Sequence, residues 1–509
     1  MNAKRFFKAP ALDPSPEATA RRAARLEEAA RLPRPAPLGP EEKAQIEAEQ
    51  FALLREDMES ERTEWRSRPY YVQLSAHNIC NLDCIMCWDG IHPTPARMTE
   101  EQIQLVGDEL LPTASVIIPH SGSEPSLPGF IDIVPESARR YRTQIQFITN
   151  GTYLDRTNYE RIRDTVAMIQ VSLDAHIRET FDIIRVGADY DQVFANLRQL
   201  VTWCREDGIE LAVSFVFLKA NAYELPEFVR FMGKEIGVDS VIVQQLYDNN
   251  ERGKELDAYG NIPDEDIEQL RLESIRIAKE VGVDLSMGLG GFEWHRNNGR
   301  ETRENRCHAD STRFLLYHHR SFCQQAAQYL KVDVNGDVYP CCHGGDPPDL
   351  KMGNLFESSL EEVWNGPEYQ KLRSEFQTGE LRKTCRECVF FRQNSGSRLY
   401  EVWLDFKHDD KHEPSDTLQG FHVQPKNLTF EPRTIRGTLT VRDEKGSVTK
   451  TFAETFELEP HTARPFHIEV DLASSGPEPL LEVVIEDVET GQELARRAIR
   501  HQFRASASV

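Results

Sequence analysis

Long apolar runs are missing from this 509-residue chain: no stretch approaches the ~20 residues that span a bilayer, so we expect no membrane span. Residues 1–30 contain basic side chains but no apolar run leading to a small-residue cleavage site, so no secretory signal is expected. Basic residues are also few, since 60 Lys and Arg face 83 Asp and Glu for a net charge of -23. This deficit argues against nucleic acid as the main partner. We expect a cytoplasmic protein.

Cysteine, in contrast, is plentiful and clustered. Ten cysteines in a reducing compartment are unlikely material for disulfides, and their grouping favours metal or redox chemistry. The length exceeds the ~250 to 300 residues at which one hydrophobic core stops growing, so two or three structural units are expected.

The pattern of apolar residues changes three times along the chain. A charged and Pro-rich arm ends in a helix that places Phe51, Leu54, Met58 and Trp65 on one face. Six short apolar runs then alternate with helical ones, which predicts an α/β fold with a parallel sheet in the form of a partial (βα)6 barrel. A cysteine-rich, irregular segment follows, and alternating runs at the end predict an antiparallel β-sandwich. The expected domains are therefore 1–68, 69–285, 286–417 and 418–509.

Three cysteines stand in a C-x3-C-x2-C arrangement directly after the first predicted strand, in the string CNLDCIMC. They are Cys80, Cys84 and Cys87. A loop at this place opens at the mouth of such a barrel, where active sites are built. Three thiolates bind three irons of a [4Fe-4S] cube and leave the fourth iron open. The alternatives are a zinc site that lacks its fourth ligand, or buried structural cysteines.

These cysteines and several later turns resemble the radical S-adenosylmethionine (SAM) superfamily over roughly residues 70–285. The resemblance implies that SAM chelates the open iron and is cleaved reductively to a 5'-deoxyadenosyl radical, which abstracts a substrate hydrogen. The string SGSEP resembles the GGEP-like turn of that family, although Ser121 and Ser123 depart from its glycine pair. The resemblance implies SAM contacts at Met86, Gly122, Glu124, Asn150, Ser172 and Asp174. It also places Arg185 and Asn221 near SAM.

A second group of cysteines, Cys323, Cys341, Cys385 and Cys388, has spacings that resemble the SPASM extension or its shorter twitch form. A complete SPASM extension would need three further cysteines after Cys388, so the resemblance implies one auxiliary [4Fe-4S] cluster. Four thiolates would close its coordination and make it an electron carrier or a structural element. Cys307 or Cys342 could replace one ligand. A structural four-cysteine zinc site is the alternative.

Within this family we expect an oxidoreductase that oxidises a carbohydrate or polyol and uses the auxiliary cluster as electron acceptor. The substrate would be a small molecule or carrier-linked, and the reductant a flavodoxin or ferredoxin. The alternatives are a peptide maturase and a non-catalytic, metal-stabilised binding scaffold. Residues 1–68 argue against the maturase, because they lack the strands that a peptide-binding winged helix needs. The candidate substrate residues are Gln244, Gln245, Tyr247, Asp248, Glu293 and His308. The candidates for a catalytic role are Tyr247, Asp248 and His308.

Overall fold

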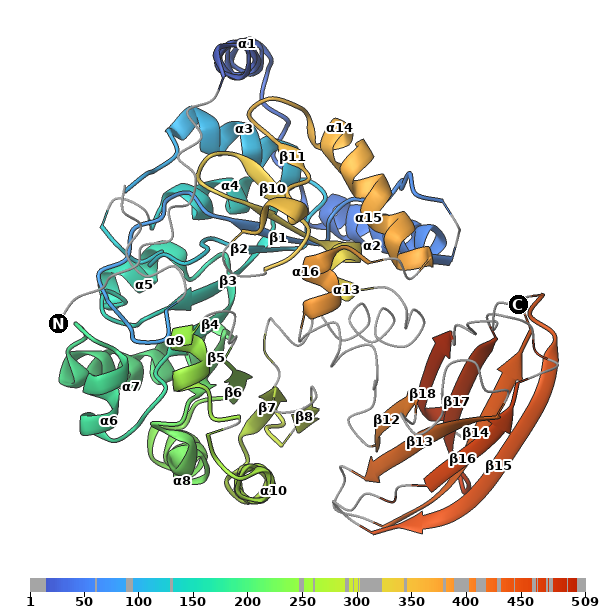
Figure 1. The fold of residues 1–509 in the computed structure, drawn as a ribbon. Helices are drawn as coiled ribbons and strands as arrows, with labels where there is room; N and C mark the ends of the chain where they lie inside the picture. Colours follow the sequence, from blue (N-terminus) through green and yellow to red (C-terminus); the bar gives the residue numbers. More distant parts are fainter. Residues whose placement is uncertain are drawn as a thin grey trace. The chain divides into compact units, whose positions relative to one another are not determined.

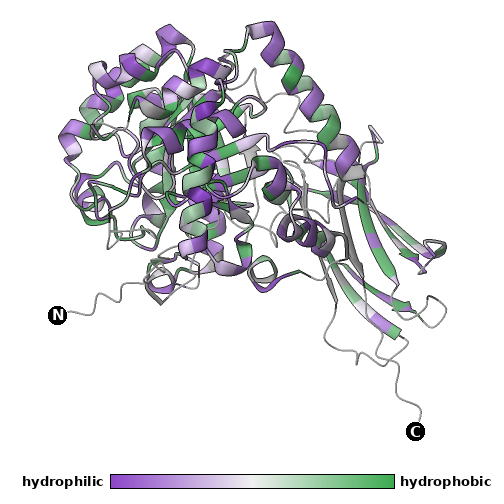
Figure 2. Cartoon of the chain, turned by 90° about the horizontal axis from the view of Figure 1, so that it is seen from above, coloured by the Kyte–Doolittle hydropathy of each residue, from purple (hydrophilic) through white to green (hydrophobic). Residues whose placement is uncertain are grey.

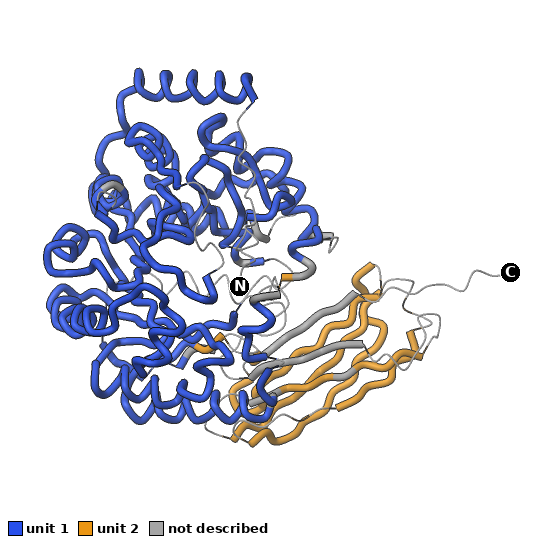
Figure 3. The backbone as a smooth tube through the Cα atoms, turned by 60° about the vertical axis from the view of Figure 1, so that its left-hand side comes forward, with its two compact units in different colours: residues 1–286, 295–315, 321–387 blue, residues 287–294, 316–320, 388–509 orange. Residues whose placement is uncertain are grey.

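Two compact units make up the computed structural model: residues 1–286, 295–315 and 321–387 form the first, and residues 287–294, 316–320 and 388–509 form the second (Figure 3). The domain boundaries expected from the sequence stay predictions. The structure describes residues 15–59, 62–87, 95–128, 131–246, 251–259, 261–288, 293–295, 297–300, 302, 323–342, 346–378, 381–388, 402–408, 418–427, 432–443, 445–459, 464, 466–472, 475, 479–491 and 493–500.

A parallel sheet forms the centre of the first unit (Figure 1). The six strands expected from the sequence pair in chain order, parallel throughout. Their bounds are β1 (Tyr71–Leu74), β2 (Val116–Ile118), β3 (Gln144–Thr149), β4 (Val166–Ser172), β5 (Glu210–Phe217) and β6 (Ser240–Gln245). The predicted α/β class with a largely parallel sheet is therefore confirmed.

Helices follow these strands and start and stop on recognisable signals. Thr99 closes a capping box with Gln102 at the start of α3, and Gly208 ends α7 with a φ of 68°. The helices of this part are α3 (Glu100–Leu110), α4 (Ile133–Tyr141), α5 (Arg156–Ile162), α6 (Arg178–Ile184), α7 (Tyr190–Asp207), η1 (Ala222–Glu224), α8 (Leu225–Arg230), η2 (Phe231–Ile236), α9 (Glu251–Leu256) and α10 (Asp264–Val281). They mix hydrophilic and hydrophobic residues (Figure 2), as helices with one buried face do.

The register of the sheet gives its two faces different chemistry. Residues paired across parallel strands share a face, and successive residues alternate between faces. One face is apolar, buried and contacted by α4 and α7; it carries Val72, Ile117, Ile145, Phe147, Ile169, Val171, Val213 and Phe215. The opposite face, called the polar face below, mixes apolar residues such as Ile118 and Met168 with polar ones, which are Gln73, Gln146, Gln170, Ser172, Ser214 and Gln244. The polar face is therefore the one that suits a site for polar ligands.

The sheet continues into the cysteine-rich segment, where the sequence predicts irregular structure, and that prediction is wrong for this part. β9 pairs in parallel with β1, and β10 and β11 add antiparallel strands beyond it. The elements are β7 (Asp284–Gly288), β8 (Glu293–His295), α13 (Gln324–Gln328), β9 (Tyr329–Val332), β10 (Asp337–Tyr339), η3 (Pro348–Leu350), β11 (Gly353–Asn354), α14 (Leu360–Trp364), α15 (Pro367–Thr378) and α16 (Lys383–Glu387). Gly336 makes the β9–β10 turn at a φ of 83°, where a Cβ would lie 2.6 Å from Phe356.

The N-terminal arm forms two helices, α1 (Pro16–Arg31) and α2 (Pro40–Glu59). Because α2 ends at Glu59, Trp65 lies beyond it, and its predicted place on the helical face is wrong. Arginines of α1 tie it to two distant parts of the first unit. Arg22 pairs with Glu357 at 3.0 Å, and Arg25 pairs with Glu109 of α3 and donates to the Leu355 carbonyl at 3.1 Å. The arm thus links a helix that follows β1 in the chain to the segment after β11.

Antiparallel sheets form the second unit, as the sequence predicts. One sheet has the order β12-β13-β16 and the other β15-β14-β17-β18. Side chains from both sheets, among them Phe421, Val423, Leu439, Val470 and Val483, share one buried core. The strands are β12 (Val402–His408), β13 (Leu418–Asn427), β14 (Arg433–Arg442), β15 (Val448–Leu458), β16 (Phe466–Asp471), β17 (Leu480–Asp487) and β18 (Glu493–Arg500). Across the described ranges of both units, no helix is long and apolar enough to cross a membrane.

Candidate active site

The loop after β1 carries Cys80, Cys84 and Cys87 and is fastened to the end of α6. The Asp83 amide donates to the Val186 carbonyl at 2.9 Å, and the Ile85 amide donates to the Ile184 carbonyl at 3.0 Å. Cys80 and Cys87 are exposed, whereas Cys84 is buried. The half-buried Met86 stands between the second and third cysteines. Three thiols are therefore held within one short, anchored loop.

Two of the thiols lie near polar donors from other loops. The Asn150 side-chain Nδ2 lies 4.0 Å from Cys80 Sγ, and the Arg185 Nη1 lies 3.7 Å from Cys84 Sγ. Burial raises the pKa of the Cys84 thiol, and the positive charge of Arg185 opposes that shift. These neighbours favour thiolate sulfur, the form that binds metal.

Glu124 joins the end of β2 to the end of β3. Its amide donates to the Ile79 carbonyl at 3.0 Å, next to the first cysteine. Its buried carboxylate accepts from the Thr149 hydroxyl at 2.6 Å and from the Asn150 backbone N–H at 2.7 Å. Burial raises the pKa of Glu124, against the effect of these hydrogen bonds. Gly122, two residues earlier, has a φ of 62° that suits glycine.

The TNG turn after β3 reaches back to the cysteine loop. The Asn150 Nδ2 donates to Asn81 Oδ1 at 2.9 Å, and Asn81 donates to the Thr152 hydroxyl at 3.1 Å. Gly151 has a φ of 77°, and a Cβ there would lie 3.0 Å from Val171. A glycine is therefore required for the turn that carries Asn150 to the cysteines.

Polar groups at the end of β4 complete the arrangement. The Ser172 hydroxyl lies on the polar face, 3.3 Å from that of Ser214. Asp174, fully buried at a φ of 64°, accepts from the Val216 amide at 2.8 Å and pairs with Arg185 at 2.6 Å. Asn221 donates to the Asp174 carbonyl at 2.8 Å. Arg185 and Asn221 thus lie beside Asp174.

The structure brings together the predicted residues of four successive loops, but not all candidates can be placed. Tyr247, Asp248, His308 and Cys307 lie outside the described residues. Gln244 is exposed at the end of β6. Their proposed roles stay predictions.

The second group of cysteines is spread over several elements. Cys323 precedes α13, Cys341 follows β10, Cys385 lies on α16, and Cys388 is the first residue of the last segment of the second unit. Negative charge on Cys342 and Cys341 adds to burial in raising the pKa of Tyr329, so these cysteines lie near β9. Within the described part of the chain, no three His, Cys, Asp or Glu side chains converge on a single-ion site. A cluster does not require such convergence, because each cysteine binds a different iron.

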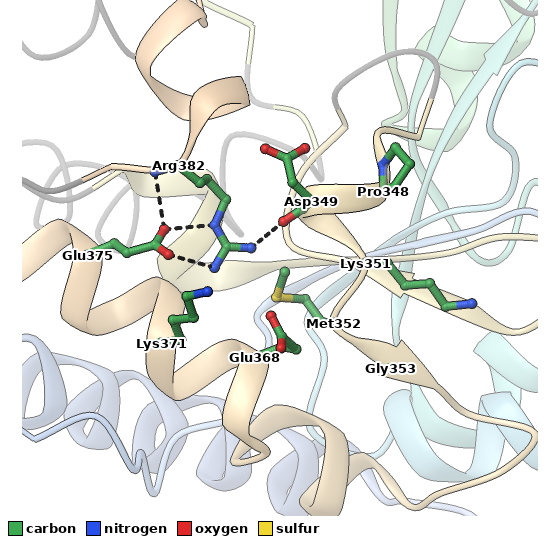
Figure 4. A pocket seen from close by; sticks show the side chains of 9 residues that line it. All are labelled: Pro348, Asp349, Lys351, Met352, Gly353, Glu368, Lys371, Glu375 and Arg382. Atoms are coloured by element: carbon green, nitrogen blue, oxygen red, sulfur yellow. Dashed lines mark hydrogen bonds and ion pairs between the residues drawn. The ribbon is translucent and has the colours of Figure 1, made fainter.

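A hollow of about 480 Å³ has a charged lining that includes Asp349, Glu375 and Arg382, the last of which directly precedes α16 (Figure 4). The Asp349 carboxylate accepts from the Thr384 hydroxyl at 2.6 Å and from the Thr384 amide at 3.2 Å. Arg382 pairs with Glu375 of α15 at 2.7 Å and donates to the Asp349 carbonyl. Because Thr384 precedes Cys385, these bonds fix the start of the helix that presents this thiol.

Replacing Asp349 by alanine should therefore weaken the second cluster. Loss of both hydrogen bonds to Thr384 frees the start of α16. The expected loss of stability is about 0.5 to 2 kcal/mol, the range for a lost helix cap. We expect Asp349→Ala to retain less of the auxiliary iron after gel filtration, while the first cluster stays. Glu368→Ala, in the same hollow but on α15, is the control and should keep both clusters. Equal iron in the two variants would contradict this role of Asp349.

Comparison with known families assigns both cysteine regions. Residues 74–232 match the radical SAM superfamily model, and residues 323–389 match the SPASM model, an iron-sulfur cluster-binding domain. The chain carries a radical SAM domain followed by a SPASM domain. The predicted family resemblance is thereby confirmed. A radical SAM domain binds a [4Fe-4S] cluster and SAM, and a SPASM domain binds auxiliary iron-sulfur clusters.

This chain spans only part of the length of the characterised relatives that it matches. The Fe-coproporphyrin III synthase of Methanosarcina barkeri is 29% identical over 161 residues, 31% of this chain and 39% of that protein. The PqqA peptide cyclase of Gluconobacter oxydans is 24% identical over 277 residues, 53% of this chain and 67% of that protein. The crystal structure of SuiB from Streptococcus suis, 16% identical, has a TM-score of 0.47 and covers 74% of this chain and 82% of that one.

The residues described above fit the two groups that a radical SAM domain binds. The loop offers three thiols, two of them beside polar donors, for a cluster with an open iron. The Ser123 hydroxyl is buried and finds no hydrogen-bond partner among the described residues. A buried hydroxyl without a partner is costly unless a ligand completes its bonding, which suits a polar ligand such as SAM.

Proposed function

We propose that this radical SAM enzyme modifies a peptide substrate. The observation that carries the proposal is the match to the PqqA peptide cyclase, which extends over more of this chain than the matches to the coproporphyrin synthase or to a GTP 3',8-cyclase of Rippkaea orientalis. The sequence favoured a carbohydrate or polyol instead. None of these relatives is named for such an oxidation, so the peptide maturase is the better supported alternative.

In this proposal the described loops have distinct tasks. Cys80, Cys84 and Cys87 hold the first cluster, and the fourth iron and SAM together supply a hydrogen-abstracting radical when bound. The second cluster is held by Cys323, Cys341, Cys385 and Cys388. The proposed SAM-binding residues are Met86, Gly122, Glu124, Asn150, Ser172 and Asp174. Glu124 also fixes the Asn150 turn, because its carboxylate accepts hydrogen bonds from the Thr149 hydroxyl and the Asn150 backbone amide.

Amide side chains on the polar face would meet the substrate. Gln170 of β4 is buried. Gln244 is exposed near the carboxyl end of β6, where it pairs with Val216 of β5. A primary amide both donates and accepts, and so pairs with a peptide group. It pairs equally well with a sugar hydroxyl, so the choice of a peptide depends on the relatives. A small-molecule or carrier-linked substrate, and a flavodoxin or ferredoxin reductant, stay predictions.

Isotope transfer distinguishes the two substrate classes. An extract of the source cells grown in deuterated medium is incubated with reconstituted protein, SAM and dithionite, and deuterium in 5'-deoxyadenosine is measured by mass spectrometry. For a peptide substrate, treating the extract with peptidase abolishes deuterium transfer and oxidising its vicinal diols with periodate leaves transfer intact. The reverse pattern would overturn the peptide proposal in favour of a carbohydrate.

The auxiliary cluster gives a separate prediction about reaction type. If the product is two electrons more oxidised than the substrate, the substrate radical must pass on one electron, and a cluster with four thiolate ligands accepts it. We expect Cys385→Ala, with its first cluster intact, to keep forming 5'-deoxyadenosine and to lose product. Normal product yield from this variant, or a product at the substrate's oxidation level, would contradict the acceptor role.

A further inference from the structure

A buried ion pair stands against the second cysteine of the first site. Arg185 is 9% exposed and Asp174 is 0% exposed. The Arg185 Nε pairs with Asp174 Oδ2 at 2.6 Å, while Nη1 lies 3.7 Å from Cys84 Sγ. Burying a guanidinium and a carboxylate is costly, and their mutual attraction often does no more than offset that cost. A gain in folding stability is therefore a weak explanation for a charged arginine beside Cys84.

Asp174 is held so firmly that it fixes the direction of the guanidinium. Its Oδ1 accepts from the Val216 amide at 2.8 Å, and Asn221 donates both to the Asp174 carbonyl and to the Val216 carbonyl, at 2.8 and 2.9 Å. A non-glycine residue at a φ of 64° is uncommon and persists where the surroundings over-determine it. With Oδ1 hydrogen-bonded to the Val216 amide and Oδ2 ion-paired with Arg185, Asp174 orients the guanidinium toward the cysteine.

We propose that Arg185, oriented by Asp174, is a positioning residue that acts on the first cluster through Cys84 and raises its reduction potential. The reduction potential of an iron-sulfur cluster depends on nearby charge, on hydrogen bonds to sulfur and on solvent exposure. Arg185 supplies a positive charge and an N–H donor that faces the sulfur of Cys84. A positive charge stabilises the reduced cluster, which carries one more electron. This role is distinct from the contact with SAM that the sequence indicated for both residues, and it does not depend on the nature of the substrate.

The test is a redox titration of the full-length, reconstituted protein without SAM, followed by electron paramagnetic resonance. The signal of the first cluster is the one that changes when SAM is added to a parallel sample. Arg185→Gln keeps a polar side chain and removes the charge, and should disfavour reduction of this cluster about tenfold, a fall of about 59 mV for one electron. Arg185→Lys should restore most of the potential.

Arg178 provides a matched control at the other end of α6. It is an exposed arginine that pairs with Asp191 and stacks on Tyr190. Arg178→Gln should leave the potential unchanged. An unchanged potential in Arg185→Gln, or an equal fall in Arg178→Gln, would overturn the proposal. If Arg185→Gln loses iron, retention of iron by Arg185→Lys supports the role of the charge, and loss in both variants overturns it. The titration needs no substrate, so its failure is separate from failure of the peptide proposal.

Discussion

Cys84→Ala should abolish formation of 5'-deoxyadenosine from SAM and remove the first cluster. Cys84 is the buried member of the three thiols, and the loop on both sides of it is tied to the end of α6. Two remaining thiolates are too few to hold a cube with an open corner. We expect about four of about eight irons per chain to be lost, and SAM cleavage to fall below detection, a loss of at least about 10³-fold, or ~4 kcal/mol.

Cys204 supplies the control for this experiment. It is a fully buried cysteine on α7, outside both groups, where it packs as a small apolar side chain. Cys204→Ala should keep its iron and cleave SAM at a rate near that of the unmodified protein. Undiminished SAM cleavage in Cys84→Ala would remove the basis for placing the first cluster on this loop.

Trp364→Ala should destabilise the first unit by about 3 to 5 kcal/mol, the range for truncating a buried tryptophan. Trp364 of α14 is fully buried, donates to the Ser67 carbonyl at 2.7 Å and packs on Tyr369 with ring centroids 4.6 Å apart. Arg373 lies 4.6 Å from its ring and 4.3 Å from that of Trp65. The substitution therefore opens the junction between the segment before β1 and the SPASM helices.

Calorimetry checks this expectation because the two units have separate cores. The transition of the first unit should move to lower temperature in Trp364→Ala, while that of the second unit stays in place. Trp203→Ala, at a half-buried position on α7, should give a clearly smaller shift. Equal shifts for the two tryptophans would show that the junction contributes nothing beyond ordinary packing.

The strands that follow a local pattern could be predicted from the sequence. β3 and β5 are short apolar runs flanked by turn signals, and such runs can be recognised as strands without knowledge of distant residues. β9 does not: its four residues YLKV contain a buried lysine, and its partner β1 lies some 250 residues earlier in the chain. Pairing between segments so far apart in the chain depends on tertiary structure, and the periodicity of apolar residues carries no information about it.

The candidate site shows the same division. The cysteines, Glu124 and Asn150 stand in motifs, so the sequence marks them without reference to their neighbours. The pairing of Arg185 with Asp174 and its approach to Cys84 depend on how three loops meet, and no spacing in the sequence encodes it. An arginine directly after a helix is most often solvated, so only the structure separates Arg185 from Arg178.

We expect this chain to hold two iron-sulfur clusters, one on each group of cysteines. Mössbauer spectroscopy of the full-length protein, reconstituted anaerobically with ⁵⁷Fe and normalised to protein, measures it most directly. We expect two four-iron clusters, about eight irons per chain, with one cluster whose spectrum changes when SAM binds. About four irons and one tightly bound zinc per chain would contradict the claim, because the second group of cysteines would then be a structural zinc site.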